Sequence, residues 1–202
     1  MSVFTESKVW NFANVLTTFR LIVAPIFIGL FVYINKYDNH YPPLVWTMTI
    51  LYMLAVASDK YDGDWARKYN LVTTYGKIID PIADKFLVLG GFIALSYCGF
   101  LPWFFTIIVG LRDFLITALR FALLKNIVIA ASDLGKWKTV SQMFLIFLFV
   151  FPFGYFIPLA ESGYFDLFRV VMMWIALVLT ILSFIDYLFV AWKAIKESKV
   201  EK

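Results

Sequence analysis

Six long runs of apolar residues, separated by short polar stretches, dominate the pattern along the chain. The runs cover residues 16–34, 44–60, 78–98, 102–124, 138–158 and 168–192. Each contains 17 to 25 residues, and none shows the strict alternation of apolar and polar positions that is typical of strands. A helix needs about 20 apolar residues to cross the hydrocarbon core of a bilayer. The pattern therefore predicts an all-α, polytopic membrane protein with six transmembrane helices.

The segment before the first run has a different pattern. Between Val3 and Phe12, apolar residues are interspersed with polar ones, which predicts a short helix lying at the membrane interface; a disordered tail is the alternative. A cleavable signal peptide is not expected, because the apolar run that follows is too long and lacks a small-residue cleavage site. No repeat or low-complexity linker divides the sequence, so we predict a single domain over residues 1–202.

Composition supports the membrane interpretation. Hydrophobic residues make up 62% of the 202 residues and charged residues only 16%. A soluble domain is about 45–50% apolar, so this chain has more apolar surface than a core of its size could bury. This composition excludes an intrinsically disordered protein, a disulfide scaffold and a nucleic-acid-binding module. The single cysteine, Cys98, allows no internal disulfide.

Basic residues are distributed unevenly among the connections. Of the 18 Lys and Arg residues, 15 lie at the N-terminal side, around the second and fourth connections, or in the C-terminal tail. Lys36 and Arg169 lie on the other side, and Arg112 lies inside a run. Because positive residues accumulate on the cytoplasmic side of a membrane, we expect both termini of this cell-membrane protein to be cytoplasmic. An even number of helices, such as six, satisfies this.

Two pairs of aspartates with helical spacing lie at the cytoplasmic ends of the second and third runs, where ionisable residues are costly and usually functional. Asp59 and Asp62 are three residues apart and Asp80 and Asp84 four, so each pair shares one helical face. Four carboxylates in a partly dry cavity repel one another unless protons or cations are bound. Oxygen ligands without His or Cys favour Mg²⁺, Mn²⁺ or Ca²⁺. Two such ions are suited to holding a pyrophosphate and stabilising phosphoryl transfer.

The residues between the two pairs also fit a phosphate ligand. Gly63 and Ala66 are small and allow a ligand to approach closely, and Gly76 does the same on the next helix. Arg67 offers a forked cation that suits phosphate. Helix caps or salt bridges would account for one or two of the aspartates, but not for the whole spaced set.

Together, these positions resemble the signature of the CDP-alcohol phosphotransferase family. The pattern runs Asp59-x-x-Asp62-Gly63-x-x-Ala66-Arg67 and, after eight residues, Gly76-x-x-x-Asp80-x-x-x-Asp84; all eight fixed positions are filled over 26 residues. Segments 14–20, 80–85 and 135–139 are similar to those of the family's phosphatidylglycerolphosphate synthases. With six spans, the resemblance covers nearly the whole chain.

The resemblance implies a reaction and a set of roles. Members of this family transfer a phosphatidyl group from CDP-diacylglycerol to an alcohol and release CMP. By resemblance, Asp59, Asp62 and Asp80 would bind two Mg²⁺ or Mn²⁺ ions, and Asp84 would share the second ion and act as the catalytic base. The implied nucleotide-binding residues are Asp62, Gly63, Ala66, Arg67 and Gly76. Members often form homodimers, and nothing in this sequence fixes the oligomeric state.

A second group of residues is expected to bind the phosphate of an anionic acceptor, sn-glycerol 3-phosphate, by charge-assisted hydrogen bonds. These residues are Thr17, Arg20, Arg112, Arg120, Lys136 and Lys138. Arg112 could instead pair with Asp113 or Asp186. Lys136 and Lys138 could extend to lipid headgroups, and Arg20 could be a positive-inside anchor.

Two other functions remain open. A sibling transferase of the same family could use inositol phosphate, serine or phosphatidylglycerol as its acceptor, although the basic residues favour a phosphorylated one over serine. A divalent-cation transporter would need acidic residues along a path across the bilayer, whereas the four aspartates cluster at one face. We therefore expect a phosphatidyltransferase of phospholipid biosynthesis, with CDP-diacylglycerol and sn-glycerol 3-phosphate as substrates and no nucleic-acid partner.

Overall fold

A computed structural model of the chain describes residues 12–38, 40–68, 74–123, 133–156 and 163–200. Within the helices, the side chains of residues 12–14, 59–68, 74–81, 120–123, 194–195 and 197–200 are outside this description. The interfacial helix predicted between Val3 and Phe12 also lies outside the described residues, apart from Phe12 itself.

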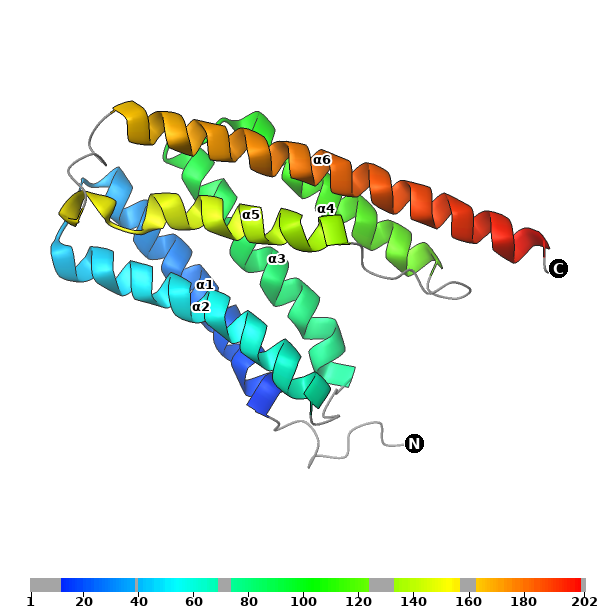
Figure 1. Ribbon diagram of the computed structural model, residues 1–202. Coiled ribbons are helices and arrows are strands. Elements are labelled where there is room, and N and C mark those ends of the chain that lie inside the picture. The colour runs from blue at the N-terminus through cyan, green and yellow to red at the C-terminus, as the bar shows by residue number, and fades with distance from the viewer. Residues whose placement is uncertain (1–11, 39, 69–73, 124–132, 157–162, 201–202) are drawn as a thin grey trace. The chain divides into compact units, whose positions relative to one another are not determined.

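Six α-helices, and no strand, make up the described residues (Figure 1). They are α1 (Phe12–Lys36), α2 (Pro42–Lys68), α3 (Thr74–Tyr97), α4 (Trp103–Leu123), α5 (Asp133–Val150) and α6 (Gly163–Val200), with a short 3₁₀ helix, η2 (Phe153–Tyr155), before α6. Each α-helix overlaps one of the six apolar runs. The predicted all-α class is therefore confirmed for the described part of the chain.

The fifth helix ends earlier than its apolar run predicts. Helix α5 stops at Val150, whereas the run extends to residue 158. Pro152 has no N–H to donate to the carbonyl oxygen of Leu148, so the helix cannot make its next bond. Instead, Nε of Arg169 on α6 donates to that carbonyl oxygen at 3.2 Å. A charged side chain thus supplies the hydrogen bond that proline removes.

The chain forms two compact units, which are described separately. Unit 1 comprises Met1–Leu101 and Phe149–Pro152, and its helix α1 packs against both α2 and α3. The ring of Phe27 on α1 has its centroid 5.2 Å from that of Tyr52 on α2. On the other side, Gly90 of α3 approaches α1 so closely that a Cβ there would lie 2.4 Å from Cδ1 of Ile28. Aromatic packing and a glycine contact therefore hold α2 and α3 against the same helix.

Unit 2 comprises Pro102–Leu148 and Phe153–Lys202, and its helix α4 packs against α6. The ring centroid of Phe153 on η2 lies 5.7 Å from that of Phe147 on α5 and 5.1 Å from that of Phe165 on α6. This aromatic cluster connects the end of α5 to the start of α6. The predicted single domain over residues 1–202 stays a prediction.

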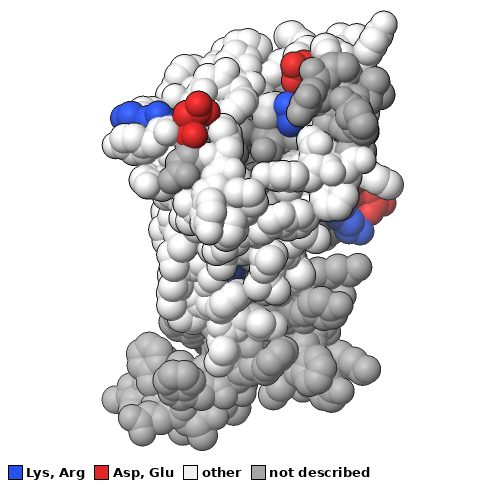
Figure 2. Space-filling view, turned by 90° about the vertical axis from the view of Figure 1, so that its left-hand side faces the viewer, with Lys and Arg blue, Asp and Glu red and all other residues white. Residues whose placement is uncertain are grey.

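Large apolar side chains cover much of the outer surface of the helices. Segments Val15–Lys36 and Gly163–Lys193 are long and apolar enough to cross a membrane, and Pro42–Ser58 is a shorter apolar segment among the described residues. Only 33% and 28% of the two long spans is buried inside the protein. Figure 2 shows one face on which uncharged side chains form a broad surface, with the described charged side chains in a few separate places. This surface indicates a membrane protein, because water-soluble monomers rarely expose such large apolar patches.

Replacing Arg169 with leucine should destabilise the protein, because the carbonyl oxygen of Leu148 would lose its donor. We expect the free energy of unfolding to fall by about 1–3 kcal/mol, measured as a lower thermal unfolding temperature of the detergent-solubilised protein. The matched control is Asp166→Asn, which removes only the exposed carboxylate that accepts from Arg169 at 3.1 Å. That change should cost less than about 1 kcal/mol. Equal losses in the two variants would contradict the role of the carbonyl bond.

Candidate active site

The two aspartate pairs lie on helical backbone, as their spacing predicts. Asp59 and Asp62 belong to α2, and Asp80 and Asp84 belong to α3. A separation of three or four residues keeps both members of each pair on the same side of their helix. The side chain of Asp84 is half-buried, and those of the other three aspartates lie outside the described side chains.

The four aspartates also lie at matching distances from their helix ends. Asp62 and Asp59 come six and nine residues before Lys68 at the end of α2, and Asp80 and Asp84 come six and ten residues after Thr74 at the start of α3. At 1.5 Å per residue, both pairs are about 9–15 Å from the end of their helix. Five residues join these ends, both helices pack on α1, and the ends lie at the same end of unit 1 in Figure 1. The fold of unit 1 therefore brings the two acidic segments to the same level.

Helix α1 contributes a buried cation near this level. Thr17 and Arg20 come five and eight residues after Phe12, or about 8 and 12 Å along the helix. Their side chains are 1% and 0% exposed. A residue that anchors a helix at the lipid headgroups needs an accessible charge, whereas the guanidinium of Arg20 is fully buried. A buried charge is stable only when it is paired or hydrogen-bonded, so Arg20 is suited to an anionic environment.

The four aspartates predicted as metal ligands are chemically suited to a divalent-cation site. Among the described side chains, no three His, Cys, Asp or Glu residues come together as a metal site, but three of the four aspartates fall outside that group. The four aspartates predicted as ligands belong to two helices that share one packing partner, α1, and α2 also carries Asp64. Hard oxygen ligands of this kind suit Mg²⁺ or Mn²⁺. The nucleotide-binding residues predicted from the sequence also lie outside the described side chains; they are Asp62, Gly63, Ala66, Arg67 and Gly76.

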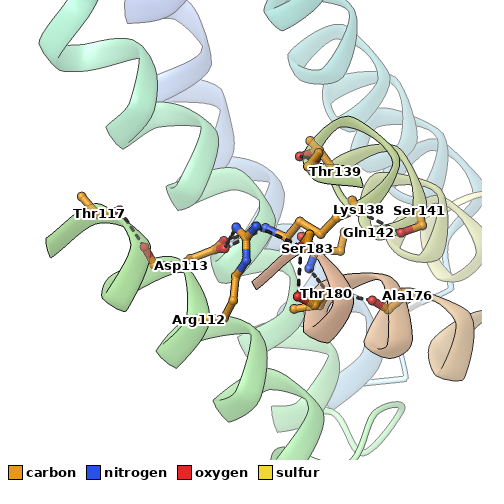
Figure 3. A network of polar contacts seen from close by, with 11 residues as sticks. Arg112, Asp113, Thr117, Lys138, Thr139, Ser141, Gln142, Ala176, Thr180 and Ser183 are labelled. Atoms are coloured by element: carbon orange, nitrogen blue, oxygen red, sulfur yellow. Dashed lines mark hydrogen bonds and ion pairs between the residues drawn. The ribbon is translucent and has the colours of Figure 1, made fainter. Parts of the chain in front are cut away.

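A separate cluster of charges lies inside unit 2 (Figure 3). Nη1 of Arg112 on α4 donates to the carboxylate of Asp113 at 2.8 Å, and Nζ of Lys138 on α5 donates to the two oxygens of the same carboxylate at 2.7 and 3.0 Å. Nη2 of Arg112 donates to the hydroxyl of Ser183 on α6 at 3.0 Å. Two of the six residues predicted to bind the acceptor phosphate are therefore brought together around one aspartate.

The other predicted phosphate-binding cations of unit 2 are placed differently. The Lys136 side chain is 71% exposed and donates to Asp133 at 2.8 Å, and this ammonium lowers the pKa of the Asp133 carboxyl below its usual value. Arg120 lies on α4, but its side chain is outside the described set. The structure thus joins Arg112 and Lys138, whereas Lys136 pairs at the surface.

Comparison with known sequences identifies the family. The sequence model of the CDP-alcohol phosphatidyltransferases matches residues 10–182, which include all eight signature positions. The chain belongs to this family. It is therefore a transferase, and the resemblance drawn from the spaced aspartates is confirmed.

Three bacterial relatives are similar over most of their length. A probable phosphatidylglycerophosphate synthase of Mycobacterium tuberculosis is 35% identical over 182 residues, which cover 90% of this chain and 82% of that protein. A CDP-diacylglycerol–glycerol-3-phosphate 3-phosphatidyltransferase of Bacillus subtilis is 33% identical over 199 residues, covering 94% and 99%. An enzyme with the same name in Rickettsia bellii is 37% identical over 183 residues, covering 88% and 93%.

Asp113 has a larger role in the structure than the sequence pattern indicates. The pattern makes it one possible partner of Arg112, whereas the structure makes it the shared partner of two cations from different helices. The available signal was its position, because it is a carboxylate inside an apolar run. Ser183 gave no such signal, since hydroxyls are common in membrane helices.

Proposed function

We propose that this chain transfers the phosphatidyl group of CDP-diacylglycerol to sn-glycerol 3-phosphate, giving phosphatidylglycerophosphate and CMP. The observation that carries the proposal is the similarity to enzymes named for this reaction in distant bacteria, over 88% or more of this chain. The eight-position signature and the matching levels of the four aspartates support it.

The roles of the residues follow from their chemistry. Asp59, Asp62 and Asp80 would hold the metal ions, with Asp84 sharing the second. Two Mg²⁺ or Mn²⁺ ions, when bound, would neutralise the diphosphate and stabilise the departing CMP. Asp84 would accept the proton of the acceptor hydroxyl as its oxygen forms a bond to the phosphatidyl phosphorus. The phosphorus–oxygen bond to CMP breaks in the same displacement, so no covalent intermediate with the protein is required.

The nucleotide and the acceptor would be bound by different residues. Gly63, Ala66 and Gly76 leave room for the cytidine, and Arg67 would bind the nucleotide phosphates by its forked guanidinium. We propose that Arg112 and Lys138 bind the phosphate of glycerol 3-phosphate. The other residues proposed for the acceptor are Thr17, Arg20, Arg120 and Lys136.

The membrane arrangement is part of the proposal. Six spans with both termini in the cytoplasm would put the ends of α2 and α3 that carry the aspartates at the cytoplasmic face. Glycerol 3-phosphate is a soluble anion of the cytosol, so the acceptor would reach the site from that side. The homodimer expected from the family resemblance stays a prediction.

The acceptor can be identified directly. Purified protein in detergent with Mg²⁺ and CDP-diacylglycerol should release CMP only after an alcohol is added, and we expect glycerol 3-phosphate to exceed serine and phosphatidylglycerol by at least about 100-fold in kcat/KM. Inositol phosphate is the most informative competitor, because it offers the same charged group. Faster CMP release with inositol phosphate would favour the sibling transferase. Cation flux in proteoliposomes without any CMP release would favour the transporter.

Asp84→Asn should remove most of the activity, because an amide cannot accept the proton of the attacking hydroxyl. We expect kcat to fall about 10²–10⁴-fold, while binding of the nucleotide, measured by titration with CMP, changes little. The matched control is Asp38→Asn in the same unit, at an exposed position with φ of 51°, a conformation that asparagine tolerates. Full activity of the Asp84 variant would contradict its role as base.

Cys98 can report the orientation of the chain. It follows the end of α3 opposite the aspartates and is the single cysteine of the sequence. In sealed spheroplasts, a membrane-impermeant maleimide should therefore label Cys98 from outside. In a Cys98→Ser background, a cysteine introduced by Lys199→Cys should react only after permeabilisation. The reverse pattern of labelling would contradict cytoplasmic termini.

A further inference from the structure

Gln142 on α5 leaves one buried hydrogen-bond acceptor unused. Its side chain amide donates through Nε2 to the hydroxyl of Thr180 on α6 at 2.9 Å, and the residue is only 1% exposed. Thr180 has a single hydroxyl hydrogen, which it donates to the carbonyl oxygen of Ala176 at 2.7 Å, so the amide must be the donor toward Thr180. The other amide atom is therefore the carbonyl oxygen Oε1. It is buried and accepts no hydrogen bond from the described residues.

The same network contains an unused donor. Nη1 of Arg112 on α4 donates to Asp113, and Nη2 donates to Ser183, which in turn donates to the carbonyl oxygen of Thr180 at 3.0 Å. Nε of Arg112 is buried and has no acceptor among the described residues. Figure 3 shows Arg112, Ser183, Thr180 and Gln142 converging from three helices. Since each unused buried group costs about 1–3 kcal/mol, a further molecule that pairs with both groups would stabilise the network.

The two unused groups define the chemistry of that molecule. Nε of Arg112 can only donate, and Oε1 of Gln142 can only accept. The half-buried carboxylate of Asp186, three residues after Ser183, cannot satisfy Gln142, because a carboxylate is also an acceptor. An ammonium group would donate to Gln142, but Arg112 and Lys138 disfavour another cation beside them. A hydroxyl both donates and accepts, so an alcohol fits these groups.

Gln142 is also close in register to the residues proposed for the acceptor phosphate. It lies four residues after Lys138 on α5, which is about 6 Å along one side of the helix. A three-carbon alcohol with a terminal phosphate can span this separation. The side chains of Arg112 and Asp113 are 15% and 13% exposed, so this part of the network is not completely enclosed by the protein.

We propose that Gln142 is a specificity-determining residue for the acceptor: its Oε1 accepts a hydrogen bond from the secondary hydroxyl of glycerol 3-phosphate. The primary hydroxyl is then left to attack the phosphatidyl phosphorus. This proposal rests on the proposed function and deepens it, because it says which part of the acceptor is recognised besides its phosphate. It requires no net charge on the network.

A structural role of Gln142 predicts a different result. In that case the amide only holds α5 against α6, and a buried water molecule pairs with Oε1. Removing the amide would then weaken the reaction of every acceptor equally. If Gln142 binds the secondary hydroxyl, removing the amide affects only acceptors that carry this hydroxyl.

The test compares two acceptors in the full-length protein. 3-Hydroxypropyl phosphate keeps the phosphate and the primary hydroxyl of glycerol 3-phosphate but lacks the secondary hydroxyl. We expect the wild type to prefer glycerol 3-phosphate by about tenfold or more in kcat/KM. In Gln142→Met, which keeps the size of the side chain and removes the amide, the preference should fall to within about twofold. An equal loss for both acceptors, or an unchanged preference, overturns the proposal.

The matched control is Ser141→Ala on the preceding residue of α5. The hydroxyl of Ser141 donates to the carbonyl oxygen of Lys138 on its own helix at 2.8 Å. This variant should therefore keep the wild-type preference for glycerol 3-phosphate. A loss of preference as large as that of Gln142→Met would overturn the specific role of the amide.

The wild type itself keeps the proposal testable if Gln142→Met does not fold. Equal kcat/KM values for glycerol 3-phosphate and 3-hydroxypropyl phosphate would show that the secondary hydroxyl is not recognised, and would overturn the proposal. The proposed function fails differently, because glycerol 3-phosphate would then not support CMP release by the wild type at all. The two failures are therefore distinguishable.

Discussion

The contact of α1 with both α2 and α3 is the constraint on which the candidate site depends. The two pairs of aspartates belong to α2 and α3. Neither helix by itself determines the level of its aspartates relative to those of the other helix. Because both helices pack on α1, through the Phe27–Tyr52 contact and the close approach at Gly90, their acidic segments come to one level. The same packing buries Arg20 of α1 near that level. Apolar side chains thus determine where the charged ones lie.

The two units contain different arrangements of charged side chains. Residues 59–84 of unit 1 contain five aspartates and four Lys or Arg residues, whereas the described cluster of unit 2 joins Arg112 and Lys138 to one carboxylate, that of Asp113. Charges in a membrane protein interact more strongly than charges in water, because they are less screened. Carboxylates are suited to metal ions, and cations are suited to phosphate. The reaction of this family needs both kinds of ligand.

The sequence predicted the helices and the acidic pattern well, for physical reasons. Six apolar runs can satisfy their backbone in a bilayer only as helices, and the aspartate spacing is a property of a single helix. The run of apolar residues predicts a longer α5, because it continues past Pro152. Apolar composition does not show that this proline removes a backbone hydrogen bond of the helix. The partner of Arg112 could not be chosen from sequence either, since the immediate neighbour on a helix does not normally face it.

Lys136 and Lys138 show a second difference between the sequence-based prediction and the structure. Two residues apart, they point to nearly opposite sides of α5, about 200° around its axis, so no single environment could accommodate both. The sequence assigned them one role, because it does not reveal which side of α5 faces its neighbours. The structure places Lys138 on the buried carboxylate of Asp113 and Lys136 at an exposed one.

The length of α6 has a consequence of its own. Its 38 residues extend about 57 Å, nearly twice the thickness of a hydrocarbon core of about 30 Å. A helix of this length that crosses a membrane would leave several turns among or beyond the headgroups, even with a steep tilt. Near its end, Nζ of Lys196 lies 5.6 Å from the ring centre of Trp192. Such a pair of a basic and an aromatic residue is typical of the membrane interface. A helix of this length that crosses a membrane would accommodate a change in bilayer thickness by tilting, or by rearrangement of the lipids around its final turns.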